Sequence, residues 1–191
     1  MEIVIILGLI FFNGILSMSE IAMVSARKSR LETAAKKGSK TAKTALRLAN
    51  EPDRFLSTIQ IGITLIGILT GLYSGEALAG DLARWLETIG IPQAHSLTLA
   101  KGIIVILVTY LTLILGELVP KHLGMNAPEK IARLIARPME VLSKIASPFV
   151  WLLSASTQAV IRLTGLHTST ENKVTEEEIK AIIQELSLIH I

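Results

Sequence analysis

The 191-residue chain contains no cysteine, which excludes disulfides, thiolate metal sites and cysteine nucleophiles. Its four histidines lie singly, at His95, His122, His167 and His190, and none has the HExxH spacing of a zinc site. A P-loop and a nucleotide-binding glycine motif are also missing. The sequence therefore gives no indication of an enzyme.

Charged residues are scarce as well. They make up 18% of the chain, half of the residues are apolar, and the mean hydropathy is +0.54. A soluble domain averages about a quarter charged residues. We therefore expect the lipid bilayer to be the solvent of this chain. The formal net charge of +3 then favours lipid headgroups over nucleic acid as the partner of its basic residues.

Three apolar stretches have the length of about 20 residues that a bilayer requires, at about 3–25, 55–73 and 97–120. A basic segment from Arg27 to Arg54 joins the first two, and short loops rich in lysine and arginine stay in the cytoplasm. We therefore predict a multi-pass protein of the inner (plasma) membrane, with its N-terminus outside and its C-terminus in the cytoplasm.

Amphipathic helices are expected at about 28–50, interrupted at Gly38, and at about 128–163. The uncharged run 145–161 leaves a fourth span as an alternative, but no basic cluster reverses the orientation, which favours a helix in the membrane plane kinked at Pro148. The predicted fold class is an all-α membrane protein with three transmembrane helices plus a belt of juxtamembrane amphipathic helices.

On this prediction, the transmembrane domain covers 1–165 and a polar linker covers 166–191. Within the second span, Gly62, Gly67 and Gly71 predict that neighbouring helices approach closely, because small residues let helix backbones come together in lipid.

A glutamate near the end of the third span is the most informative residue. An ionised carboxylate at the centre of a bilayer helix costs roughly 2.5 to 3.5 kcal/mol, so Glu117 calls for a function. Pro120 has no N–H to offer to the carbonyl of Gly116, four residues earlier. A carboxylate and a free carbonyl side by side are the hard oxygen donors that Mg²⁺ or Ca²⁺ prefers. An ion pair with Lys121 is the alternative for Glu117.

Each span also carries a face of oxygen-bearing side chains. On the first span, Asn13, Ser17 and Glu20 share a stripe, and Ser19 lies off it. A single hydroxyl in a membrane helix more often links helices than binds an ion, and an ion pair with Arg27 or Lys28 is the alternative for Glu20. The corresponding faces are Ser57, Gln60 and Thr64 on the second span and Thr109, Thr112 and Gly116 on the third.

Three motifs occur in an order that resembles the CorC/CNNM magnesium transporter family. They are Asn13-Gly14 with Ser17-Met18-Ser19-Glu20, the run from Asp53 to Gly62, and Gly116-Glu117-Leu118-Val119-Pro120-Lys121 followed by Pro128-Glu129. The resemblance covers about residues 1–185 and matches that family's N-terminal transmembrane domain. It implies a homodimer that exports magnesium, driven by sodium, with a dehydrated Mg²⁺ held by Ser17, Ser19, Gly116 and Glu117.

Two features depart from that family. Many members have Gly-Asn-Asn or Gly-Asn-Thr in the second helix, where this chain has Gly62-Ile63-Thr64, so Thr64 or Gln60 would have to supply that ligand. Members also continue into an ATP-binding CBS pair, which is absent from this chain. Residues 174–185 resemble the linker to that pair, and 186–191 depart from it as a foreign tail would. We therefore expect no regulation by ATP in this chain.

The resulting hypothesis is a magnesium transporter domain that works by alternating access, with Mg²⁺ as transported ion and Na⁺ as coupling ion. The alternatives are a membrane anchor and dimerisation module for cytosolic domains, and a divalent cation channel. The expected metal ligands are Asn13, Ser17, Ser19, Thr64, Gly116 and Glu117, and the expected additional residues of the ion pathway are Glu20, Ser57, Gln60 and Thr112.

Overall fold

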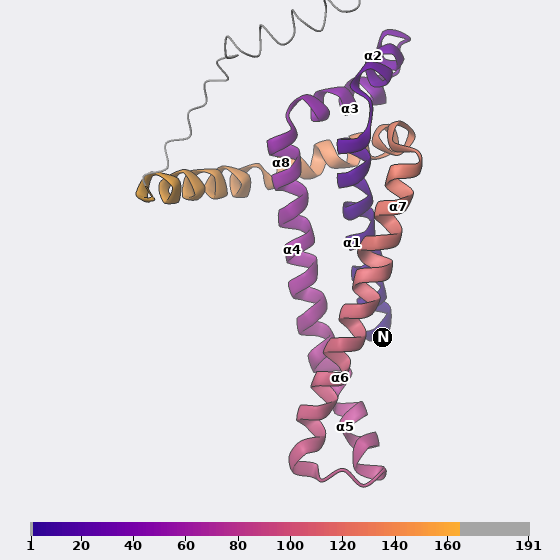
Figure 1. Ribbon diagram of the computed structural model, residues 1–191, viewed down its shortest axis with the longest axis vertical. Helices are drawn as coiled ribbons and strands as arrows, with labels where there is room; N and C mark the ends of the chain where they lie inside the picture. Colours follow the sequence, from indigo (N-terminus) through magenta and orange to yellow (C-terminus); the bar gives the residue numbers. More distant parts are fainter. Residues whose placement is uncertain (1, 165–191) are drawn as a thin grey trace, which may run out of the picture. The chain divides into compact units, whose positions relative to one another are not determined.

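The computed structural model describes residues 2–164, apart from the side chains of residues 76 and 77 (Figure 1). The described chain is almost entirely helical, with short connecting segments, and has no strand. Three stretches of it, Glu2–Ser25, Pro52–Thr88 and Gln93–Asn126, are long and apolar enough to cross a membrane. The predicted fold class is therefore confirmed. The linker expected at 166–191 lies outside the described residues.

The first span is one helix, α1 (Glu2–Ser25). The second begins with α4 (Pro52–Ala77), where Pro52 occupies the first turn and Asp53 adds the acidic residue that a helix N-terminus favours. The third consists of α6 (Gln93–Leu113), a π-helical turn η1 (Ile114–Leu118) and α7 (Val119–Asn126). Between the second and third spans, α5 (Ala79–Thr88) packs against α6, and Ser96 Oγ donates to Glu87 Oε1 over 2.7 Å.

The basic segment forms two short helices, α2 (Lys28–Lys36) and α3 (Lys40–Asn50). They separate at Gly38, whose φ of +90° is a left-handed conformation that glycine adopts without steric cost. The next helix, α3, is capped by Ser39 Oγ, which accepts a hydrogen bond from the backbone N–H of Ala42.

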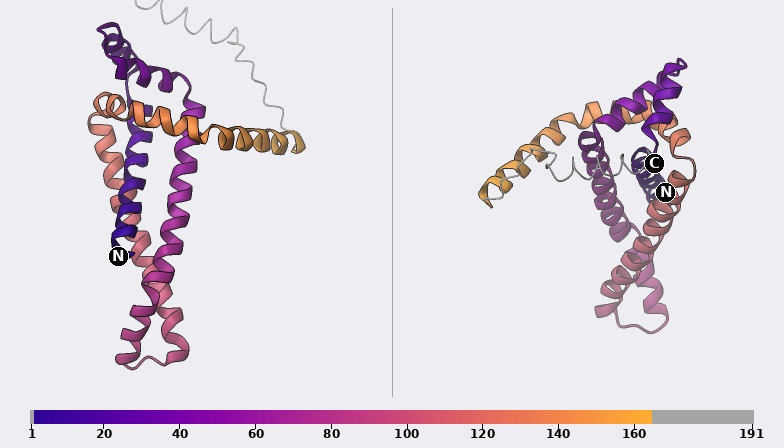
Figure 2. Two further views of the ribbon diagram at one scale, coloured as in Figure 1. Left: turned by 180° about the vertical axis from the view of Figure 1, so that it is seen from behind. Right: turned by 45° about the horizontal axis from the view of Figure 1, so that its top comes forward.

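The first and third spans run parallel to each other, as Figures 1 and 2 show. Their close approaches follow the same order along both helices: Asn13 contacts Gly116, Gly14 faces Pro120, and Gly124 lies against Met18 and Ile21. This is the geometry expected of the odd-numbered spans of a three-pass chain, whose second span runs in the opposite direction.

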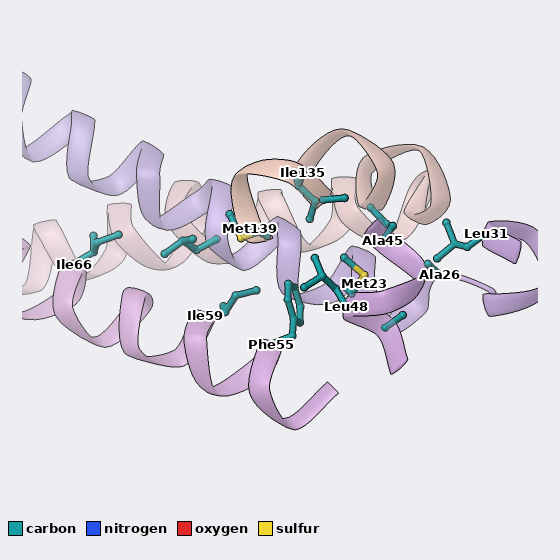
Figure 3. Packing of buried hydrophobic residues seen from close by; sticks show 14 residues of the cluster. Met23, Ala26, Leu31, Ala45, Leu48, Phe55, Ile59, Ile66, Ile135 and Met139 are labelled. Atoms are coloured by element: carbon teal, nitrogen blue, oxygen red, sulfur yellow. The ribbon is translucent and has the colours of Figure 1, made fainter. Parts of the chain in front are cut away.

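One hydrophobic cluster holds α1 to the juxtamembrane helices and to α4. Figure 3 shows Met23, Leu48 and Phe55 from α1, α3 and α4 packed with Ile135 and Met139 of α8 (Pro128–Leu163). Arg47 of α3 forms an ion pair with Glu140, and Arg54 Nη2 donates to Ser147 Oγ over 3.0 Å. The first part of α8 is therefore fixed to α3 and α4 by both apolar and polar contacts.

Residues 151–163 continue α8 as helix, and Ser156 Oγ donates to the carbonyl of Leu152. α8 is not among the three stretches of the described chain that are apolar enough to span a membrane. The orientation of 139–163 along the membrane plane stays a prediction.

Candidate cation site

The third span widens into a π-helical turn where the GELVPK motif lies. In η1, the backbone N–H of Val119 bonds to the carbonyl of Ile114, five residues earlier. Such turns are frequent at functional sites. Pro120 follows in the first turn of α7, where its missing N–H is tolerated. The span expected at about 97–120 lies within a longer helical stretch, because the π turn lets the helix pass the proline and continue to Asn126.

The carbonyl of Gly116 has a partner in another span. Asn13 Nδ2 of α1 donates to Gly116 O over 3.1 Å, and this bond is buried. The expectation of an unpartnered carbonyl is therefore corrected: Pro120 removes its helical partner, and Asn13 replaces that partner. Residue 116 has little room for a side chain, since a Cβ there would lie 3.2 Å from Asn13 Nδ2 and 3.3 Å from Ile10 O.

Glu117 forms an ion pair within the same motif. Lys121 Nζ lies 2.6 Å from Glu117 Oε1, and the two side chains are 33% and 42% exposed respectively in the isolated chain. This is the alternative that the four-residue spacing left open. The carboxylate thus holds a primary ammonium in this structure, and its role as a metal ligand stays a hypothesis.

Among residues 2–164, three buried side-chain oxygen atoms on α1 and α6 have no hydrogen-bond partner: Asn13 Oδ1, Ser17 Oγ and Thr112 Oγ1. Asn13 and Ser17 are only 5% and 1% exposed and lie one turn apart on the same face of α1. A buried polar atom without a partner costs about 1–3 kcal/mol, so three of them call for an explanation. Neutral oxygen atoms beside a carboxylate are the donor set that a hard cation uses.

The remaining predicted residues lie differently. Ser19 is fully buried, and its hydroxyl donates to the carbonyl of Ile15 over 2.6 Å, within its own helix. Thr64 and Gln60 are exposed on α4, and Ser57 is half-buried. The structure of this single chain therefore brings Asn13 and Gly116 together with Glu117 adjacent, but it does not bring the α4 side chains into a buried site.

Glu20 is half-buried on α1 and takes part in no ion pair within residues 2–164, so the alternative pair with Arg27 or Lys28 is not formed there. Over the same range, no three His, Asp or Glu side chains come together as a metal-binding cluster. A cation site in the described part of the chain would therefore depend on neutral oxygens around one carboxylate.

Sequence reasoning missed the glycines that bring the first and third spans together. A Cβ at Gly14 would lie 2.9 Å from Pro120 Cγ, and one at Gly124 would lie 2.3 Å from Ile21 Cγ2. The glycines of the second span were expected to pack in this way, but against the described residues only Gly62 does, against Leu16. The available signal was that Gly14 lies in the first predicted span and Gly124 just after the third, and these two spans are predicted to run in the same direction.

A second polar region lies at the juncture of α3, α4 and α8. A groove of about 250 Å³ is lined by Arg47, Arg54, Glu140 and Lys144 together with their neighbours. Hydrogen bonds from Lys144 and then Arg47 lower the pKa of Glu140, because they stabilise its ionised form. This carboxylate serves as the ionic link between α3 and α8.

These features define a multi-pass membrane domain with polar groups buried between its spans. Residues 4–187 match the model of the Cyclin M transmembrane N-terminal domain (CNNM), which covers nearly the whole chain. The chain belongs to this family. Membrane transport is the role that the family and its relatives indicate, and the family is not a known class of enzyme.

The relatives include proteins from several bacteria. The chain is 46% identical over 185 residues to a UPF0053 protein of Synechocystis sp., which covers 97% of this chain and 41% of the relative. It is 30% identical to the UPF0053 protein YhdT of Bacillus subtilis, over 96% of this chain and 40% of the relative. It is 29% identical to the polyamine export protein of Escherichia coli, over 96% and 41%. The chain therefore spans less than half the length of these relatives.

Proposed function

We propose that this chain is the ion-translocating domain of a magnesium exporter that is driven by sodium entry. The observation that carries the proposal is the pair of buried, unpartnered oxygens Asn13 Oδ1 and Ser17 Oγ on one face of α1, where the Asn13 amide contacts the carbonyl of Gly116, the residue before Glu117. These oxygens suit Mg²⁺, which prefers hard donors at short and regular distances. Ser19 and Thr64 complete the proposed ligand set when the domain changes conformation or when a second copy packs against it.

The need for a coupling ion follows from the charge of the cargo. Moving one charge across a potential of 100 mV costs about 2.3 kcal/mol, hence roughly 4.6 kcal/mol for a divalent cation leaving a negative interior. Sodium entering down its gradient supplies this free energy. Alternating access exposes the site around Glu117 first to the cytoplasm and then to the outside. The ion pathway includes Glu20, Ser57, Gln60 and Thr112.

The proposed setting is the plasma membrane, with the N-terminus outside and α2, α3 and α8 on the cytoplasmic side. The excess of lysine and arginine in 27–54 supports this orientation. We further propose a homodimer that packs through α4 and α6. A groove of about 170 Å³ there is lined by Gly67, Gly71 and Thr112 among others, and a Cβ at either glycine would meet nothing within 4 Å in this chain.

Magnesium binding to wild type, Ser17→Ala and Glu117→Gln, measured by titration calorimetry in detergent, tests the proposal. We expect both substitutions to weaken binding at least tenfold. Glu32→Gln is the matched control, because Glu32 also pairs with a lysine four residues later but lies on the exposed surface of α2. Binding that is equal in wild type and Glu117→Gln contradicts the proposed site.

Flux into proteoliposomes distinguishes the alternatives. Magnesium flux that requires a sodium gradient supports the exchanger. Flux that persists without this gradient and follows voltage alone identifies a channel. Absence of both flux and binding identifies an anchor and dimerisation module.

A second candidate cargo is a linear polyamine. The observation in its favour is that the Glu117 carboxylate already holds a primary ammonium, that of Lys121, over 2.6 Å. One relative is a polyamine export protein. A competition experiment decides between the two cargoes. A diamine that displaces Mg²⁺ and is itself transported favours the polyamine. A diamine that is neither bound nor transported favours magnesium as the cargo.

A further inference from the structure

Lys121 is the one cationic side chain that pairs with Glu117 among the ion pairs of the described chain. Its ammonium is 2.6 Å from Glu117 Oε1, and the two residues follow each other by one turn where η1 passes into α7. The adjacent Gly116 carbonyl accepts from Asn13, and Asn13 Oδ1 has no partner. The proposed cation site and this ammonium therefore share one carboxylate.

A membrane span carries a charge at high cost, and an opposite charge nearby reduces that cost. Glu117 paired with Lys121 is neutral as a unit. The span can therefore hold its carboxylate inside the bilayer while no transported cation is present. The same contact creates a conflict on binding, because an ammonium and a metal dication repel each other at the distances within one site.

We propose that Lys121 is a built-in counter-ion, which occupies Glu117 while the site is empty and which the transported cation must displace. This inference rests on the proposed function, since it needs Glu117 to be a ligand. Lys121 has four side-chain carbons and is one third exposed, so its ammonium can move away from the carboxylate. When the cation leaves, the ammonium returns and keeps the carboxylate neutralised.

The competition lowers the affinity of the site, and a transporter needs this because a tightly bound ion does not leave. Lys121 is a positioning residue that sets affinity and release, and it is not itself a ligand. The chain offers a matched pair for comparison. Glu32 and Lys36 have the same spacing, with 2.9 Å between Nζ and Oε1, but both side chains are more than half exposed on α2.

The test measures MgCl₂ binding by titration calorimetry to the full chain in detergent. We expect Lys121→Met to bind Mg²⁺ at least tenfold more tightly than wild type, Lys121→Arg to bind much as wild type does, and Lys36→Met to show no change. In proteoliposomes, Lys121→Met should transport more slowly at saturating Mg²⁺, because release limits the cycle. The inference is overturned if Lys121→Met binds Mg²⁺ no more tightly than wild type while Glu117→Gln loses binding. The proposed function then stays intact.

If Glu117→Gln binds Mg²⁺ as tightly as wild type does, the proposed function is contradicted. Failure of the proposed function and failure of the counter-ion inference are therefore distinguishable. A measurement on wild type covers the case in which Lys121→Met does not fold. Wild type is labelled with ¹⁵N-lysine, and its ammonium signals are recorded by NMR. The signal that is missing from the spectrum of Lys121→Arg belongs to Lys121. A shift of this signal on adding MgCl₂, toward that of a freely hydrated lysine, supports displacement, and a signal unchanged at saturating MgCl₂ overturns it.

Discussion

The side-chain Nδ2 of Asn13 donates to the backbone carbonyl of Gly116 over 3.1 Å, across 103 positions of sequence. This bond ties the first span to the π turn of the third span. The bond gives the Gly116 carbonyl a donor in place of the N–H that Pro120 lacks. The other polar atom of the same amide, Asn13 Oδ1, is buried and has no donor among the described residues. One side chain thus stabilises the turn and presents an oxygen atom for an ion.

Asn13→Ala should destabilise the domain by about 1–3 kcal/mol, because the Gly116 carbonyl stays buried and loses its donor. Thermal unfolding in detergent measures this loss. Asn50→Ala is the control, since Asn50 is exposed at the end of α3 and should melt as wild type does. Equal melting temperatures for Asn13→Ala and Asn50→Ala would show that the bond contributes little.

Gly124→Ala should destabilise the contact between α1 and α7 by about 1–3 kcal/mol. The added Cβ would lie 2.3 Å from Ile21 Cγ2 and 2.8 Å from the backbone oxygen of Met18, so the backbones must move apart. Gly8→Ala is the matched control in α1, because a Cβ there meets nothing within 4 Å. We expect the control to melt no lower than wild type, and a Gly124→Ala protein that does the same contradicts the packing.

Ser17→Ala separates a structural role from an ionic one. Its hydroxyl is buried without a partner, so its removal should leave stability unchanged or slightly raised when no divalent cation is present. Added Mg²⁺ should stabilise wild type and not the variant, because only a protein that binds the ion gains from it. Ser96→Ala is the contrast, since it loses a hydrogen bond to Glu87 and should melt lower with or without Mg²⁺.

Gly71→Cys tests the proposed dimer. The chain has no cysteine, so this substitution introduces a single thiol into the groove between α4 and α6. A homodimer packed there should form a disulfide-linked pair under mild oxidation, seen as a doubled mass on a non-reducing gel. Gly8→Cys, which lies on α1 outside that groove, should stay monomeric on the gel. Equal cross-linking of both variants would speak for random collision in the membrane.

The ion pair of Glu140 should make stability depend on pH. Hydrogen bonds from Lys144 and Arg47 hold the pKa of Glu140 below its ordinary value of 4.5. A lowered pKa stabilises the fold above the ordinary value, and this contribution is lost as pH falls through the lowered one. Wild type should therefore melt above Glu140→Gln near pH 7, and the difference should shrink below pH 4.5 and vanish once the carboxylate is protonated in the folded protein.

The control for this measurement is Glu51→Gln. Glu51 lines the same groove and is exposed, but it takes part in no ion pair within residues 2–164. We expect its melting temperature to follow that of wild type at every pH. A constant difference between wild type and Glu140→Gln down to low pH would mean that the carboxylate acts through packing and not through its charge.

Some of this arrangement could be predicted from the sequence because it depends on local spacing. Unbroken apolar runs identify the spans, Gly38 separates the two basic helices, and the four-residue spacing of Glu117 and Lys121 allows the pair that the structure contains. Asn13 and Ser17 share a helix face for the same reason.

The π turn could not be predicted in this way. Pro120 removes one backbone N–H from the helix. The helix can respond by ending there or by widening its preceding turn. Which of these occurs depends on the residues that pack against this part of the helix. Here Pro120 lies against Gly14 of α1, which leaves room for the helix to continue. The Asn13–Gly116 bond also requires the register between two spans that are far apart in sequence. For Thr64, the sequence predicts which face of its helix it occupies. It does not predict which part of the chain packs against that face.

The parallel pairing of the first and third spans also sets an order of events during synthesis. Residue 13 emerges from the ribosome 103 positions before residue 116. At about 5–20 residues per second, Asn13 waits roughly 5–20 s for its partner. During that time, the Asn13 amide and the Ser17 hydroxyl of α1 are not yet covered by the third span. The insertion machinery, or another helix, must therefore shield this face of α1 until translation delivers the π turn.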